Sequence, residues 1–206
     1  MRVVIYDDTD RKYFGLLRLS WIIGATLGRL FGVFTLAYPA KDWTETLQWM
    51  IDYSEAHQKK WSEVQFWCHG SWGAVILGKS RLTALTARRE YKNKLQELQE
   101  HMEVSGYWWF RTCGSFASTL GHSFAKTLVQ TLDRDVWAHT YLVHLWQSGL
   151  VRHTPERTTC WWPVEMGVKE GTPERPTKMK LSTPFSTRTL LALRLRIPPR
   201  FWRPGA

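Results

Sequence analysis

The sequence predicts an α/β fold of three layers, in which a mostly parallel sheet is flanked by helices. Over residues 1–150, short apolar runs alternate with longer amphipathic stretches. Strands that are joined by helices form crossover units, and these units build parallel sheets. At 206 residues and 44% hydrophobic side chains, the chain is long enough to bury one good core. We therefore expect a single α/β domain over residues 1–150.

The expected elements follow one another in a regular order. Short apolar runs predict strands at residues 3–6, 64–69, 74–78, 107–112 and 135–140. Apolar residues at helical spacing predict helices at residues 16–31, 43–58, 82–102 and 115–132. The first of these helices has apolar residues on nearly every face, which is typical of a largely buried helix. Asp42 is placed to cap the second helix, with Glu45 three residues later.

Residues 151–206 differ in character from the rest of the chain. They are rich in Pro, Thr and Trp and carry +7 of the net charge of +10. We expect a loop-rich C-terminal extension that packs on the same domain, with one late strand at 187–197. Basic segments bind nucleic acid or anionic lipid through phosphates, but this one has no basic helix and no RNA-binding signature. Nucleic-acid association is therefore the weakest of the functions considered.

The apolar stretch at 14–34 is not expected to cross a membrane. Arg18 and Arg29 leave an uncharged run about half as long as the roughly 20 residues that a span needs. Residues 2–10 before it indicate a strand that ends in acids, which differs from the basic leader of a signal peptide. A cytoplasmic location is the expectation, and a secreted effector remains the open alternative.

The cysteines indicate reduced thiols. There are three, and the spacing of Cys68, Cys113 and Cys160 matches neither a disulfide framework nor a paired-cysteine zinc site. His139 and His144 are five residues apart, and no acid completes a metal-binding set with them. We expect neither a metal nor an organic cofactor.

Two residues suited to nucleophilic chemistry stand at the ends of predicted strands. His69 ends one strand, and Cys113 follows another directly before a helix. In open parallel sheets, reaction sites lie beyond the carboxyl ends of the strands. The positive end of the helix dipole and the nearby Arg111 would favour the Cys113 thiolate, and His69 could accept the thiol proton. The two residues are therefore a candidate catalytic dyad.

Further residues are expected around this dyad. Gly70 and Gly114 would allow backbone amides to point at a developing oxyanion. The groups expected to position a substrate are Arg111, Trp72, Gln147 and Ser148. Cys68 should point away from His69, because successive side chains on a strand face opposite sides, and Cys160 is assigned no chemistry.

These motifs also resemble a known family. The segments "EVQFWCHGSWGAVILG", "YWWFRTCGSFASTLGHSFAKTLV" and "DVWAHT" resemble the caspase-like clan of cysteine peptidases, and are most similar to an uncharacterised bacterial caspase-like domain family. In that clan a His-Gly pair ends one strand and the nucleophilic cysteine ends the next. The separation here is 44 residues, against roughly 50 in caspases. The resemblance covers about residues 60–145.

The resemblance implies a cysteine peptidase acting on a peptide or protein. Cys113 would be the nucleophile, His69 the general base or orienting imidazole, and the amides of Gly70 and Cys113 the oxyanion donors. The alternative is a catalytically inactive domain of the same fold, which binds a protein partner through its Trp-rich, basic C-terminal region. The pattern predicts neither the cleavage specificity nor the oligomeric state.

Overall fold

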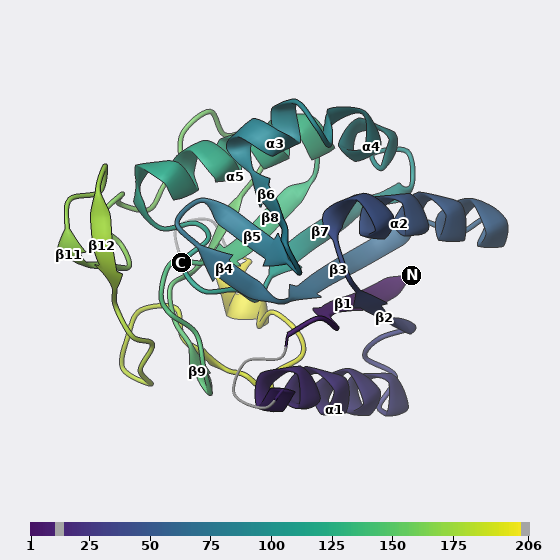
Figure 1. Cartoon of the computed structure of the whole chain (residues 1–206), viewed down its shortest axis with the longest axis horizontal. Coiled ribbons are helices and arrows are strands. Elements are labelled where there is room, and N and C mark those ends of the chain that lie inside the picture. Colours follow the sequence, from purple (N-terminus) through teal and green to yellow (C-terminus); the bar gives the residue numbers. More distant parts are fainter. Residues whose placement is uncertain (11–14, 203–206) are drawn as a thin grey trace.

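Six strands form a central sheet in the computed structural model, which describes residues 1–10 and 15–202 (Figure 1). From one edge to the other they are β10 (Leu150–His153), β8 (Asp135–His139), β7 (Met102–Phe110), β3 (Trp61–Trp67), β1 (Arg2–Asp7) and β2 (Leu36–Ala40). All neighbours are parallel except β10 and β8. The predicted mostly parallel sheet is confirmed. Because β10 begins at Leu150, the sheet continues into the part of the chain that was expected to be loop-rich.

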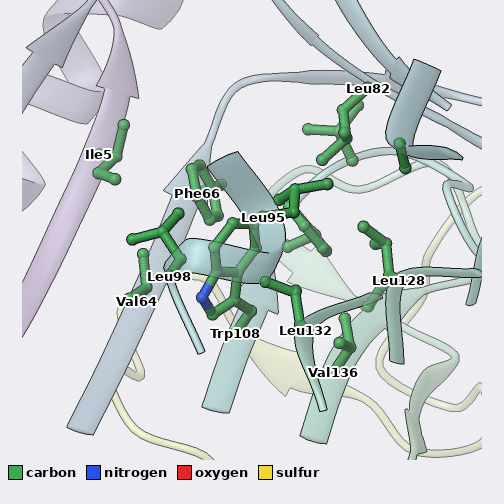
Figure 2. Packing of buried hydrophobic residues seen from close by; sticks show 14 of the residues in the cluster. Ile5, Val64, Phe66, Leu82, Leu95, Leu98, Trp108, Leu128, Leu132 and Val136 are labelled. Carbon is green, nitrogen blue, oxygen red and sulfur yellow. The ribbon is translucent and has the colours of Figure 1, made fainter. Parts of the chain in front are cut away.

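Helices cover both faces of this sheet, as expected for an α/β fold. One face is covered by α2 (Trp43–His57), α3 (Ala84–Arg88), α4 (Lys92–Glu97) and α5 (Ser118–Leu132), whereas α1 (Leu16–Leu30) lies on the other (Figure 1). Successive side chains of a strand point to opposite faces. Val3 and Ile5 accordingly join the core beneath α2 to α5, and Val4 packs on the side of α1. Figure 2 shows the larger core, where Phe66 and Trp108 lie among leucines of the covering helices.

The C-terminal segment completes the second face. Leu190, Ile197 and Phe201 pack against Trp109 and Trp137 of the sheet in a cluster of buried side chains. A 3-10 turn, η2 (Pro199–Phe201), ends this segment. The face is therefore covered partly by α1 and partly by residues about 190 to 202.

Three small sheets surround the central one. The strands β4 (His69–Ser71), β5 (Ala74–Leu77) and β6 (Ser80–Thr83) form an antiparallel meander. The two others pair β9 (Trp146–Gln147) with β13 (Leu190–Leu191), and β11 (Val168–Gly171) with β12 (Pro176–Met179).

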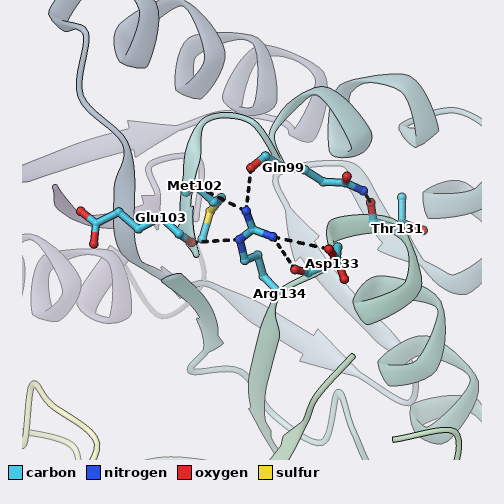
Figure 3. Close-up of polar contacts among 6 residues, drawn as sticks. All are labelled: Gln99, Met102, Glu103, Thr131, Asp133 and Arg134. Carbon is cyan, nitrogen blue, oxygen red and sulfur yellow. Dashed lines mark hydrogen bonds and ion pairs between the residues drawn. The ribbon is translucent and has the colours of Figure 1, made fainter. Parts of the chain in front are cut away.

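One arginine, Arg134, ties together the sheet edge opposite to the carboxyl ends of β3 and β7. The Arg134 guanidinium donates to the carbonyl oxygens of Glu103 at 2.9 Å, Gln99 at 3.0 Å and Asp133 at 2.6 Å (Figure 3). The bonds to Gln99 and Glu103 join the turn before β8 to the turn before β7 and to the start of β7.

Several elements differ from the predictions, and β2 was not predicted as a strand. The helix expected at 82–102 is instead β6 followed by the short helices α3 and α4, because Leu82 pairs with Val75 in a strand and Thr83 caps α3. The strand expected at 64–69 ends at Trp67, and His69 begins β4. The late strand expected at 187–197 has only two residues, because its partner β9 is equally short.

The prediction that the first helix is largely buried is wrong. Ala25 and Gly28 are the buried residues of α1, whereas Leu16, Leu19 and Ile23 each expose more than half of their surface. Small residues form its inner side, so the helix approaches the sheet closely without burying its large side chains. No helix within residues 1–10 and 15–202 is long and apolar enough to cross a membrane.

Candidate active site

The candidate site lies at the carboxyl ends of the adjacent parallel strands β3 and β7. The Arg111 amide just after β7 donates to the Phe66 carbonyl oxygen of β3 at 2.9 Å, which keeps the two chain ends side by side. Gly70 packs directly on the segment that follows β7. A methyl group at Gly70 would lie 2.5 Å from the carbonyl oxygen and 2.9 Å from the nitrogen of Cys113. A glycine is therefore required for the His69–Gly70 backbone to come this close to Cys113.

His69 and Cys113 line the same cavity, which has a volume of about 450 Å³. Its other walls come from three parts of the chain: α1, the loop after β8, and the C-terminal segment. The residues that these parts contribute include Leu17, Trp21, Val143, His144, Leu145, Ala192, Leu193 and Leu195. The two residues of the predicted dyad thus line one cavity, at the sheet edge that the strand-end argument indicated.

The Cys113 thiol is half-buried and protonated in its resting state. Its Sγ lies 3.8 Å from the Val143 carbonyl oxygen, to which it donates a weak hydrogen bond. Burial raises the pKa of Cys113 above that of an ordinary thiol, because it disfavours the charged form. We expected the helix dipole and Arg111 to favour the thiolate, and this expectation is wrong. Helix α5 begins only at Ser118, so its N-terminus is not at the sulfur.

The imidazole of His69 has an acidic neighbour that the sequence analysis missed. Its Nε2 lies 3.5 Å from Oδ1 of Asp10, whose side chain is buried, and its ring meets the edge of Trp21 at a centroid distance of 5.7 Å. Asp10 follows β1, and β1 is the neighbour of β3 in the sheet. The acids after the first strand were the signal that could have identified it, because carboxyl ends of parallel strands meet at one edge.

Gly114 does not have the role expected for it. Its amide donates to the Tyr141 carbonyl oxygen at 3.0 Å and is therefore not available to an oxyanion. Its φ of 54° lies in the left-handed region, and any β-carbon would collide with the side chain of Met179. Gly114 is needed for the turn between β7 and α5. Within the described parts of the chain the Cys113 amide donates no backbone hydrogen bond, so the predicted oxyanion donors that remain are Gly70 and Cys113.

Arg111 is a buried cation in the wall of the cavity. Its guanidinium lies between the rings of Trp67 and Trp109, 4.9 and 4.8 Å from their centroids. Its Nε donates to Oε1 of Gln147 at 3.0 Å, and its Nη2 donates to the carbonyl oxygen of Ala192. Burial lowers the pKa of Arg111 to about 9, which leaves it charged at neutral pH. Of the predicted positioning groups, Arg111 and Gln147 both line the cavity.

The other two predicted positioning groups do not reach the cavity. Trp72 lies in the turn between β4 and β5, outside the residues that line this space. Ser148 is fully buried, and its hydroxyl lies 2.7 Å from that of Thr189. It holds the loop before β10 in place. His144, in contrast, lines the cavity, with its Nε2 2.8 Å from the Ser182 carbonyl oxygen.

The remaining cysteines are poor nucleophiles. Burial raises the pKa of Cys68 well above its ordinary value and that of Cys160 to about 12. Among the residues that the structure describes, one group of three side chains has the spacing of metal ligands, namely Glu55, Glu97 and His101. These residues belong to α2, α4 and the turn after α4 and do not line the cavity.

Comparison with known proteins yields one match. A family model described as a domain of unknown function, DUF4347, matches residues 33–145, which is more than half of the chain. The matched region contains His69 and Cys113 but neither Asp10 nor the C-terminal wall of the cavity. No curated protein and no solved structure that was compared with the chain matches it.

Proposed function

The chain belongs to the DUF4347 family of domains of unknown function, and we propose that it is a cysteine hydrolase acting on a peptide or protein. One observation carries the proposal. Cys113 and His69 line one cavity at the carboxyl ends of adjacent parallel strands, where Gly70 lets their backbones meet. Open parallel sheets bind their ligands at this edge. The same order of His-Gly and Cys on neighbouring strands supports a caspase-like fold.

The proposed reaction uses residues of the chain alone. The Cys113 sulfur attacks the substrate carbonyl carbon while its proton passes to His69, and the backbone amides of Gly70 and Cys113 stabilise the oxyanion. His69 then donates the proton to the leaving amine, and a thioester remains on Cys113. Water, deprotonated by His69, hydrolyses the thioester and restores the thiol. The Asp10 carboxylate, 3.5 Å from His69 Nε2, stabilises the imidazolium that forms in each half-reaction.

The raised pKa of Cys113 makes base catalysis necessary in this scheme. A thiol that is neutral at rest is a weak nucleophile, so His69 must remove the proton as the substrate binds. The same observation favours a second candidate function, a catalytically inactive domain that binds a protein partner. The two candidates differ in whether Cys113 forms an acyl intermediate.

The test uses p-nitrophenyl acetate, a small ester that needs no specific side-chain pocket. Incubation should acetylate Cys113 and release p-nitrophenol, because the hydrolase proposal requires a thioester at this sulfur. Cys113→Ala should remove turnover without a change in Tm. His69→Ala should slow acetylation about 100-fold, the lower end of what a general base contributes. Peptide mass mapping locates the acetyl group, and p-nitrophenol absorbance gives the rate.

His144→Ala is the matched control, because His144 lines the same cavity but hydrogen-bonds to the Ser182 carbonyl oxygen. It should leave the acetylation rate of Cys113 within about twofold of the parent's. Acetylation of Cys113 no faster than that of Cys160, and unaffected by the loss of His69, would contradict the hydrolase proposal. That result would favour the inactive binding domain.

A further inference from the structure

The solvent face of α1 is a mostly apolar stripe, interrupted by the exposed Ser20. Residues spaced three and four apart along the helix share one side of it, and these large side chains fall within roughly 120° of its circumference. Their exposed fractions are high: Leu16 63%, Leu19 51%, Ile23 51%, Leu27 42%, Leu30 75% and the following Phe31 73%. A surface helix normally turns this kind of stripe toward the core. Here the stripe faces outward.

The inner side of α1 fixes this orientation. A methyl group at Gly24 would lie 2.7 Å from the Trp67 ring, and one at Gly28 would lie 2.5 Å from Phe34. No larger residue fits at these contacts, so the helix cannot rotate its leucines inward without separating from the sheet. The outward position of the apolar stripe is therefore built into the packing.

The hydroxyl groups of Ser20 and Thr26 on this helix do not require water. The Ser20 hydroxyl donates to the Leu17 carbonyl oxygen at 2.7 Å, and the Thr26 hydroxyl donates to the Ile22 carbonyl oxygen at 2.8 Å. Hydroxyls that bond back to the preceding turn satisfy themselves within the helix. An apolar medium can thus cover the stripe without leaving these hydroxyl groups unpaired.

The segments that carry the stripe and its neighbours are basic in sequence, and an acid from outside them, Asp8, pairs with Arg18 of α1 at 2.6 Å. Residues 11–41 and 175–206 contain no Asp or Glu. Arg29 is exposed in the last turn of α1. The exposed Arg194 and Arg196 flank Leu195, whose Cδ1 would lie 3.2 Å from a methyl group at Gly28. The C-terminal segment therefore places two arginines beside the helix.

We infer that α1, together with residues 193–196 of the C-terminal segment, docks the chain on the surface of an anionic lipid bilayer. This lipid-binding face consists of the apolar stripe of α1, Leu193, and the rim formed by Arg194 and Arg196. Apolar side chains enter the boundary between headgroups and acyl chains, while arginines at the rim contact anionic headgroups. The helix lies in the interface and does not cross the membrane, because 15 residues span only about 22 Å.

Charge distinguishes this occupant from a second copy of the chain. In a symmetric dimer the same surface meets itself, and the segments that form it, residues 11–41 and 175–206, offer the arginines no Asp or Glu. Each Arg near an anionic leaflet, in contrast, is attracted to it. A bilayer containing phosphatidylserine would bury the apolar stripe and place negative headgroups beside the arginines of the rim.

Flotation of the full chain with lipid vesicles tests the inference. The protein should bind vesicles of phosphatidylcholine and phosphatidylserine at a ratio of 7:3, and bind pure phosphatidylcholine at least about tenfold more weakly. Raising the salt from about 0.1 to 0.5 M should reduce binding to the anionic vesicles, because the shorter Debye length screens the rim. The double variant Ile23→Asp/Leu27→Asp should lower binding more than about tenfold, since each buried apolar side chain contributes about that factor.

Each change to this face has a matched control elsewhere, which separates its effect from a general effect of charge or hydrophobicity. Leu85→Asp/Leu120→Asp changes leucines that are 59% and 51% exposed on α3 and α5, and it should leave vesicle binding unchanged. Arg194→Gln/Arg196→Gln should weaken binding to anionic vesicles about tenfold or more. Arg88→Gln/Arg89→Gln removes the same charge from the opposite face of the sheet and should have little effect.

Three results would overturn the inference. One is failure of the parent chain to float with anionic vesicles. Another is equal loss of binding in the α1 variant and in the α3/α5 control. The third is a dimer in the absence of lipid, seen by light scattering, that dissociates in Ile23→Asp/Leu27→Asp, because a second copy would then cover the stripe.

Discussion

A buried imidazole links the stability of this protein to pH. His139 at the end of β8 is fully buried beside Trp109, and its Nδ1 lies 3.1 Å from the Ser148 carbonyl oxygen. Burial lowers the pKa of His139 to about 3, because the protein interior disfavours the imidazolium. His153 responds in the same direction, with a pKa lowered to about 4 by burial. Both side chains are neutral in the folded chain at neutral pH.

Replacement of His139 should make the free energy of unfolding fall less steeply as the pH drops below about 6.5. Below the ordinary histidine pKa of about 6.5 the unfolded chain binds a proton at this residue and the folded chain does not. The free energy of unfolding should therefore fall as pH drops below 6.5, by up to about 1.4 kcal/mol per pH unit for His139. In His139→Gln this contribution is absent. Urea unfolding of both proteins at pH 7.5, 6 and 5 measures the difference, and identical slopes would contradict the assignment.

At the scale of elements, the sequence predicted those features that depend on interactions between residues close together in the chain. Asp42 caps α2 as expected, with its Oδ1 2.9 Å from the Glu45 amide. The long helix expected at 82–102 failed because Leu82 is drawn into a strand by Val75, a partner from the preceding hairpin. The periodicity of apolar residues reflects a single segment and carries no information about pairing with a neighbouring strand.

Removal of the α2 cap should have a modest and measurable cost. Asp42→Ala leaves an amide of the first turn without its acceptor, and we expect a loss of about 1 kcal/mol in the free energy of unfolding. Asp52→Ala in the same helix is the control, since Asp52 accepts a bond from the Gln48 side chain at an exposed position. The control should change stability by less than about 0.5 kcal/mol. Denaturant unfolding monitored by circular dichroism gives both values, and equal losses would argue against the cap.

The candidate site was only partly predictable from sequence. His69 and Cys113 could be paired, because carboxyl ends of neighbouring parallel strands lie at one edge of the sheet. Asp10 contacts His69 from a strand more than fifty residues earlier, and that contact depends on the order of strands, which periodicity does not encode. The Gly114 amide was misassigned because its acceptor, the Tyr141 carbonyl oxygen, belongs to a distant loop.

At the scale of the whole molecule, two separate layers hold the sheet. The helices α2 to α5 cover one face, and the other depends on α1 and on a segment more than 150 residues away in sequence (Figure 1). Ile197 is 6% exposed, within the cluster that covers Trp109 and Trp137. It lies outside the region matched by the family model, yet it packs on strands within that region.

Truncation of Ile197 should therefore destabilise the entire sheet. Ile197→Ala leaves a cavity against the sheet, and we expect a loss of about 2 to 4 kcal/mol in the free energy of unfolding. Leu193→Ala, from the same segment but 77% exposed, should change stability by less than about 0.5 kcal/mol. Circular dichroism and tryptophan fluorescence should report one shared transition. Transitions at different denaturant concentrations would mean that the C-terminal segment unfolds independently.

The C-terminal wall of the cavity has a consequence for the order in which the protein is made. Ala192, Leu193 and Leu195 close the space around Cys113, yet a ribosome adds them about 80 residues after that cysteine. At 5 to 20 residues per second the delay is roughly 4 to 16 s. During that interval the Cys113 thiol lies beside a cavity that lacks its C-terminal wall. The cavity around the thiol is therefore completed only after the strands that position Cys113 have been made.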